Sequence, residues 1–150
     1  MFINSAGDIR LDIWPGEIFR CPPRTLTNAH SLLFASISCD VHPIHQDAEF
    51  ASHTGFTSPL IHGLLLASLT ALGSSDGHAK TENFVIVEQS CRYLKPAHVG
   101  DTVYPSLTVE KLWEQDHQTF CQLSTSILDQ HGELLLTGFQ RYLVLPPATI

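Results

Sequence analysis

The second half of the chain alternates apolar and polar residues, which is the pattern of half-buried β-strands. In the stretch from Val103 to Val109, for example, every second residue is apolar. Four strands are predicted, one beginning at 84–87 and three spanning 103–109, 120–128 and 134–145. The sequence Asp129-Gln130-His131-Gly132 predicts a hairpin turn between the last two strands. A second turn is expected at 98–101, and one or two earlier strands are expected between Ile9 and Leu26.

The first half of the chain has a helical or irregular pattern instead. One helix is predicted to begin at residues 27–28, a Thr and an Asn, because both residue types are good N-caps. Leu33 and Ile37 share one face of this helix at helical spacing. The helix is expected to end near Cys39, because Pro43 biases the residue before it toward an extended conformation.

Two further helices are expected before the strands begin. A short one spans 47–54, with Asp47 as its cap and Gly55 as its stop. The stretch from Leu60 to Leu72 is apolar on nearly every face, which predicts a buried helix about 20 Å long at 1.5 Å per residue. A buried helix followed by long antiparallel strands predicts an α+β fold, in which one sheet curls around one helix. A parallel α/β arrangement is disfavoured, because no helices separate the later strands.

Composition narrows the class of protein. A length of 150 residues predicts one domain over 1–150. The formal net charge is −7, and the eight Lys and Arg residues do not cluster, which argues against nucleic acid as a partner. Charged residues make up 15% of the chain, against about 25% in an average soluble domain. This shortage predicts that another subunit covers part of the surface, so a homodimer or a higher homo-oligomer is expected.

The cysteines and the apolar stretches indicate the compartment. No two cysteines form a Cys-x-x-Cys pair, and residues 1–14 lack the basic flank and apolar stretch of a secretory signal. No apolar stretch reaches the roughly 20 residues of a membrane span. A cytoplasmic protein with reduced thiols and no membrane partner is therefore expected. The cysteines are Cys21, Cys39, Cys91 and Cys121.

The densest polar cluster runs from Asp40 to Asp47. Asp40 and His45 are five positions apart and would diverge on a regular helix, but Pro43 disfavours a helix here. A tight loop can turn both groups toward one point, where they can hold a water molecule for general acid–base catalysis. Histidine suits this task because its ordinary pKa is about 6.5. The alternative is a polar loop, in which Asp40 caps the next segment and the histidines face solvent.

A second candidate lies at 58–64, at the head of the predicted buried helix. The free N–H groups of a helix N-terminus can polarise a carbonyl oxygen, and Gly63 would let a ligand approach the backbone closely. This role requires the helix to begin near residues 61–62. If Ser58 were the cap and Pro59 the first helical residue, the Gly63 N–H would already be bonded within the helix. The later start is expected, and the alternative is a glycine that only lets the helix pack closely against the sheet.

Several segments together match the pattern of one family: Arg24–Thr27, Asp40–His45, Phe50-Ala51-Ser52, Gly55-Phe56, Pro59–Leu64 and Tyr93–Thr102. On these segments the chain resembles the MaoC-like (R)-specific enoyl-CoA hydratases from about Gly16 to Leu145. The resemblance implies a hot-dog fold, usually paired into a dimer, and the addition of water to a trans-2-enoyl-CoA or the reverse dehydration. At the matching positions it implies that Asp40 and His45 are the catalytic pair and that the Gly63 N–H binds the thioester oxygen.

Two positions depart from the family pattern. The family often has Asn where this chain has His42, and Gly where it has Cys39. Both departures leave the catalytic pair intact, but they leave the acyl group of the substrate open. His42 is expected only to orient the loop, and Cys39 either narrows the site or packs beside it.

The remaining expectations concern ligands and competing functions. No cofactor is implied, since the CoA thioester is the substrate, and no metal is expected because no pair of histidines has the spacing of a helical zinc motif. The alternatives are a hot-dog acyl-CoA thioesterase and a non-catalytic acyl-CoA-binding subunit. Basic residues are candidates for the CoA phosphates, but solvated strand ends are the preferred explanation, so these residues are left out of the expected site; they are Arg92, Lys95, Lys111 and Arg141.

Overall fold

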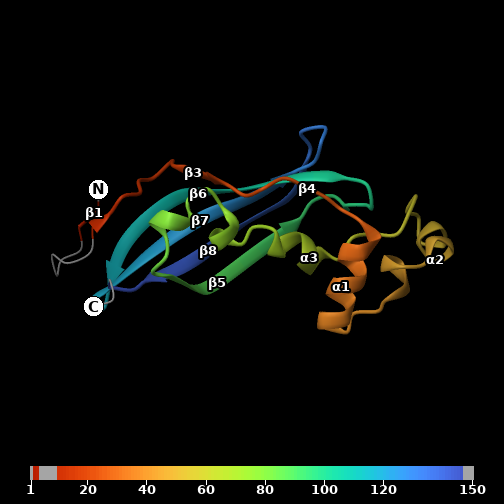
Figure 1. Ribbon diagram of the computed structural model, residues 1–150, viewed down its shortest axis with the longest axis horizontal. Helices are drawn as coiled ribbons and strands as arrows, with labels where there is room; N and C mark the ends of the chain where they lie inside the picture. Colours follow the sequence, from red (N-terminus) through yellow and green to blue (C-terminus); the bar gives the residue numbers. More distant parts are fainter. Residues whose placement is uncertain (1, 4–9, 147–150) are drawn as a thin grey trace.

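An antiparallel sheet dominates the fold (Figure 1). The computed structural model describes residues 2–3 and 10–146. Its strands are β1 (Phe2–Ile3), β2 (Arg10–Leu11), β3 (Ile18–Arg20), β4 (Arg24–Thr25), β5 (Phe84–Tyr93), β6 (Thr102–Gln115), β7 (Gln118–Leu128) and β8 (Leu134–Val144). Its helices are α1 (Asn28–Ser38), α2 (Ala48–His53) and α3 (Gly63–Ser68), with 3₁₀ turns η1 (Pro43–His45), η2 (Leu72–Ser74) and η3 (His78–Lys80).

The main sheet has the strand order β3-β6-β7-β8-β5, with β4 also paired to β6. The four long strands lie where the alternating pattern predicts them, and every pairing is antiparallel. The predicted core face of β6 is confirmed, because Val103, Leu107 and Val109 are at most 1% exposed. The predicted turn at 98–101 is confirmed as well, with Gly100 at φ +100°.

Helix α3 is much shorter than the helix predicted over 60–72, so that prediction is wrong in length. The backbone N–H groups at the predicted start bond elsewhere: Leu60 N–H donates to the Ile44 carbonyl and Ile61 N–H to the Ala97 carbonyl. At the other end the Ser68 hydroxyl bonds to the carbonyl three residues back, a contact that competes with the helical ladder. Nor is the helix buried all round, because Leu64 is 68% exposed.

The two earlier helices begin and end as the sequence predicts. Helix α1 follows Thr27 and ends at Cys39, which has a left-handed backbone. Helix α2 is capped by Asp47, whose carboxylate accepts two backbone N–H groups. Both helices lie at one end of the sheet, and β1 lies at the opposite end (Figure 1). The apolar face of α1 points away from this chain, since Leu33 is 63% and Ile37 is 83% exposed.

The core consists of two clusters along the sheet. One surrounds α3 and the site described below, and its members are Leu26, Ile61, Leu66, Ala67, Ala97, Val103, Ile127, Leu135 and Leu136. The other includes Cys21 and Cys121, and burial raises the pKa of Cys121 to about 12. All four cysteines are free, which confirms the prediction of unpaired thiols. Among the helices of the described residues, none has the length and apolar character to cross a membrane. Half of residues 1–14, the segment for which no secretory signal is predicted, lie outside the described residues.

Candidate active site

Asp40 and His45 face each other in the loop that links α1 to α2. The chain leaves α1 through Cys39 and then forms η1 around Pro43, so the two side chains turn back toward one another. Asp40 Oδ2 lies 3.8 Å from His45 Nε2. This separation is longer than a good direct hydrogen bond but short enough for one water molecule to contact both atoms. The predicted convergence of the two groups is therefore confirmed.

The orientation of His45 is set by its other ring nitrogen. His45 Nδ1 lies 2.8 Å from the carbonyl oxygen of Leu60, and a carbonyl can only accept, so Nδ1 carries the hydrogen. In neutral His45 the lone pair is then on Nε2, the ring nitrogen nearer to Asp40 Oδ2. The Asp40 side chain is 46% exposed and that of His45 only 14%, so the pair lies at the boundary between solvent and protein.

His62 adjoins this pair, a contact that the sequence analysis did not find. Its ring is stacked on the His45 ring, with centroids 3.8 Å apart and planes tilted by 23°. His62 Nε2 lies 3.0 Å from the backbone oxygen of Asp40, and the residue is 1% exposed. One signal in the sequence could have indicated this contact: His62 stands in an otherwise apolar stretch, and a polar residue that is buried needs a polar partner.

His42 and Cys39, the two departures from the family pattern, both shape the loop. His42 Nδ1 accepts the backbone N–H of Ile44 at 3.2 Å, and its ring meets the ring of Phe50 edge-on. The backbone of Cys39 has φ +60°, a left-handed conformation that glycine adopts at the lowest cost. This left-handed backbone gives a physical reason why the family often has glycine at this position.

Gly63 is the first residue of α3, as its expected role requires. The first hydrogen bond within the helix runs from Leu66 N–H to His62 O, so the Gly63 N–H lies ahead of the helical ladder. Gly63 and His45 line the same cavity of about 340 Å³. The ring of Tyr93 closes over Gly63, where a Cβ atom would lie 3.1 Å from Tyr93 Cε1. Partial burial raises the pKa of the Tyr93 phenol, which is therefore protonated at neutral pH.

A metal ion fits this cluster poorly. Potential ligand atoms of Asp40, His45 and His62 lie within 4.8 Å of one another. However, each imidazole lone pair lies in the plane of its ring, and the two rings are stacked rather than converging. One nitrogen of each ring is also engaged by a backbone carbonyl. The absence of a metal stays a prediction: elemental analysis of the purified protein is expected to show no stoichiometric zinc or iron, and either metal at one ion per chain would contradict it.

With this geometry in place, comparison with known proteins decides the family. Residues 14–130 match the model of the family described as MaoC like domain. The chain belongs to the MaoC-like family. Its sheet and short helices match the solved hot-dog structures of MaoC-like proteins, which confirms the α+β hot-dog fold.

Named relatives of this MaoC-like protein are hydratases and dehydratases. It is 36% identical to an (R)-specific enoyl-CoA hydratase of Aeromonas caviae, over 70% of this chain and 76% of the relative. It is 28% identical to a mitochondrial 3-hydroxyacyl-[acyl-carrier-protein] dehydratase of Arabidopsis thaliana, over 87% of this chain and 76% of the relative. A solved (R)-hydratase of A. caviae superposes with a TM-score of 0.78 at 30% identity, covering 89% of this chain and 98% of that one. The MaoC-like chain is thus an enzyme of the hydratase and dehydratase group, the hydro-lyases.

Proposed function

We propose that this enzyme adds water to a trans-2-enoyl-CoA, or removes it from the corresponding 3-hydroxyacyl-CoA, as a single MaoC-like domain. The observation that carries the proposal is the 3.8 Å approach of Asp40 Oδ2 to His45 Nε2, beside a cavity that His45 shares with Gly63. The A. caviae relative, named as an enoyl-CoA hydratase, supports this substrate class.

Hydration forms one C–O bond and one C–H bond, and the C=C double bond becomes single. The hydroxyl group of water adds to Cβ, and a proton is delivered to Cα. In the proposed mechanism Asp40 and His45 share the water molecule on one face of the substrate. One of them takes a proton from the water, and the pair supplies the proton to Cα. Which of the two residues acts as the base and which as the acid stays open.

The negative charge that develops on the thioester oxygen needs a hydrogen-bond donor. We assign this role to the Gly63 N–H, which is free of the helical ladder and lies at the cavity wall. A helix as short as α3 has a small dipole, so the donor itself is expected to provide most of the stabilisation.

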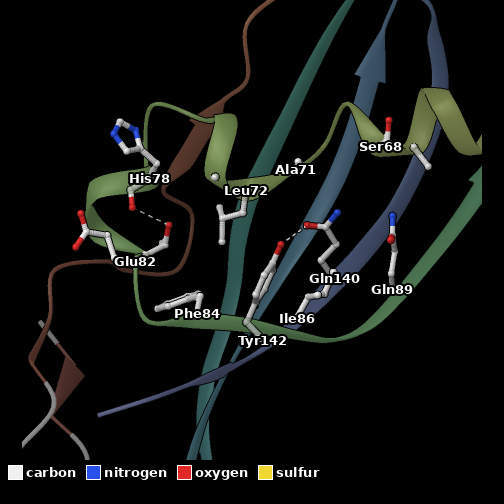
Figure 2. Close-up of a pocket in the computed structure, with 13 residues that line it drawn as sticks. Ser68, Ala71, Leu72, His78, Glu82, Phe84, Ile86, Gln89, Gln140 and Tyr142 are labelled. Atoms are coloured by element: carbon white, nitrogen blue, oxygen red, sulfur yellow. Dashed lines mark hydrogen bonds between the residues drawn. The ribbon is translucent and has the colours of Figure 1, made fainter. Parts of the chain in front are cut away.

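The acyl chain of the substrate is proposed to follow a groove between α3 and β5. The cavity at His45 and Gly63 shares Tyr93 with a second cavity of about 390 Å³, which in turn shares Ser68 and Gln89 with a third of about 620 Å³. Figure 2 shows this third cavity. Its apolar wall is formed by Ala71, Leu72, Phe84, Ile86 and Tyr142.

Two of the polar side chains that line the third cavity, those of Gln140 and Tyr142, are already paired. The Tyr142 hydroxyl donates to Gln140 Oε1 at 2.6 Å (Figure 2), and Gln140 Nε2 donates to Thr70 Oγ1 at 2.9 Å. These two groups need no ligand, and although Ser68, His78, Thr81, Glu82 and Gln89 also line the cavity, most of its accessible lining is apolar. An unsubstituted hydrocarbon acyl chain fits this chemistry better than a charged one.

A spectrophotometric screen of trans-2-enoyl thioesters tests the proposal. Each acyl chain is tested both as its CoA thioester and as its acyl-carrier-protein thioester, because the A. thaliana relative is named as a dehydratase of acyl-carrier-protein substrates. Loss of the conjugated enoyl absorbance without release of free thiol is expected on CoA. Release of thiol from saturated acyl-CoA would instead favour the thioesterase. Tight binding of acyl-CoA without turnover would favour a non-catalytic subunit.

We also propose that the enzyme is a homodimer or a higher homo-oligomer. Strand β5 forms one edge of the described sheet, and Val85 and Val87 on it are each about half exposed without lining any of the three cavities. The exposed apolar face of α1 at Leu33 and Ile37 supports the same conclusion. Light scattering is expected to give at least twice the chain mass of 16.6 kDa, and a monomer mass would contradict this proposal.

A further inference from the structure

We propose that His62 is a positioning residue, which holds the Asp40–His45 pair at a fixed distance from the Gly63 N–H. This inference rests on the proposed function, since that function assigns roles to these three groups. It concerns a residue that itself need not touch the substrate.

His62 makes one contact with each of the three groups. Its Nε2 lies 3.0 Å from the backbone oxygen of Asp40, and since that oxygen only accepts, Nε2–H is the donor. Its ring stacks on the ring of His45 at 3.8 Å. Through the backbone it is the N-cap of α3, directly bonded to Gly63. One rigid ring therefore connects the loop of the acid–base pair to the helix head that carries the amide donor.

The surroundings of His62 hold this ring in place. The residue is 1% exposed, and the ring of Phe34 from α1 lies 5.1 Å away from its own ring. With the hydrogen on Nε2, the Nδ1 atom needs a donor, yet among the described residues this buried atom has no hydrogen-bond partner. Burying an unpaired polar atom costs free energy. A phenyl ring would avoid that cost and would lose only the bond to the backbone oxygen of Asp40, an exposed residue, so stability alone gives a poor reason for a histidine here.

The distance between the two parts of the site matters for the chemistry. The thioester oxygen, Cα and Cβ are held in one conjugated unit, so the amide donor and the acid–base pair must match a fixed spacing. A misplacement of about 1 Å can reduce the rate of a positioned reaction about a hundredfold. His62 is placed to prevent such a shift.

The test compares His62→Phe with His62→Gln. Phenylalanine keeps the stacked ring and removes the donor to Asp40, whereas the amide nitrogen of glutamine occupies nearly the place of Nε2 and keeps it. We expect His62→Phe to lower kcat about 10- to 100-fold, with KM changed less than threefold and Tm unchanged or raised. His62→Gln is expected to recover part of kcat although its Tm is lower.

Leu26→Val is the matched control, because Leu26 is 1% exposed and packs in the core cluster around α3 without lining the three cavities. It is expected to lower Tm and leave kcat unchanged. The proposal is overturned if His62→Phe keeps the wild-type kcat, if its loss lies in KM alone, or if kcat follows Tm across the three variants.

Crystal structures of wild type and His62→Phe test the positioning without any activity. We expect the Asp40 carboxylate to move relative to Gly63 N by about 0.5 Å or more, the tolerance within which such groups must be held. Unchanged positions would overturn the inference. If the wild-type enzyme hydrates no enoyl thioester, the proposed function fails, and this structural comparison still decides whether His62 fixes the spacing.

Discussion

Asp40→Asn and His45→Asn are each expected to lower kcat for hydration by about a thousandfold, within the 10²- to 10⁴-fold range of general acid–base catalysis. Asp40→Asn replaces a carboxylate, which can exchange a proton with the shared water molecule, by an amide, which cannot, and His45→Asn removes the imidazole nitrogen that faces Asp40. Asn at position 40 can still accept the His42 N–H, and Asn at position 45 can still donate to the Leu60 carbonyl. Both proteins should therefore fold, with Tm close to that of the wild type. The measurement is kcat and KM for the best enoyl thioester from the screen.

The double variant distinguishes a cooperating pair from two independent residues. If Asp40 and His45 act on one water molecule, removing both should cost little more than removing one. If the loss of kcat in the double variant instead equals the product of the two single losses, the two groups act in separate steps. Near-normal turnover by either single variant across a broad panel of enoyl-CoAs would refute the assignment of the pair.

Gly63→Pro is expected to lower kcat about a hundredfold to a thousandfold, the usual effect of removing one oxyanion donor. Proline has no N–H but is well tolerated at the first position of a helix, which Gly63 occupies. The preceding residue, His62, has ψ 128°, a conformation that is compatible with a following proline. The substitution therefore removes the proposed donor while the backbone can keep its path.

Gly63→Ala is the matched control for this substitution. It adds a Cβ atom 3.1 Å from Tyr93 Cε1, as proline does, but it keeps the N–H. Because the Tyr93 side chain is half exposed, its ring can move by a few tenths of an ångström. A small loss for alanine and a large loss for proline would support the donor role. Equal losses in the two variants would show that crowding of Tyr93, rather than the N–H, is responsible.

Much of the fold could be predicted because its signals are local. Alternation of apolar and polar residues is a property of each strand alone, so the four long strands were found, although β6 continues to Gln115, well beyond its predicted end at Val109. The bounds of α1 and α2 follow from capping residues within the same segment, such as Asp47. The bounds of α3 could not be predicted in this way. At its predicted start the N–H groups of Leu60 and Ile61 bond to the carbonyls of Ile44 and Ala97, which are distant in the sequence.

By itself the sequence determined which residues are candidates: a carboxylate and an imidazole in a loop that Pro43 keeps from being helical, and a glycine at the head of a helix. The tertiary structure decided how they meet. It brought Asp40 to 3.8 Å from His45 and placed His62 against both. These are contacts between segments, and their distances depend on how the α1–α2 loop packs on α3. A local pattern carries no information about that packing.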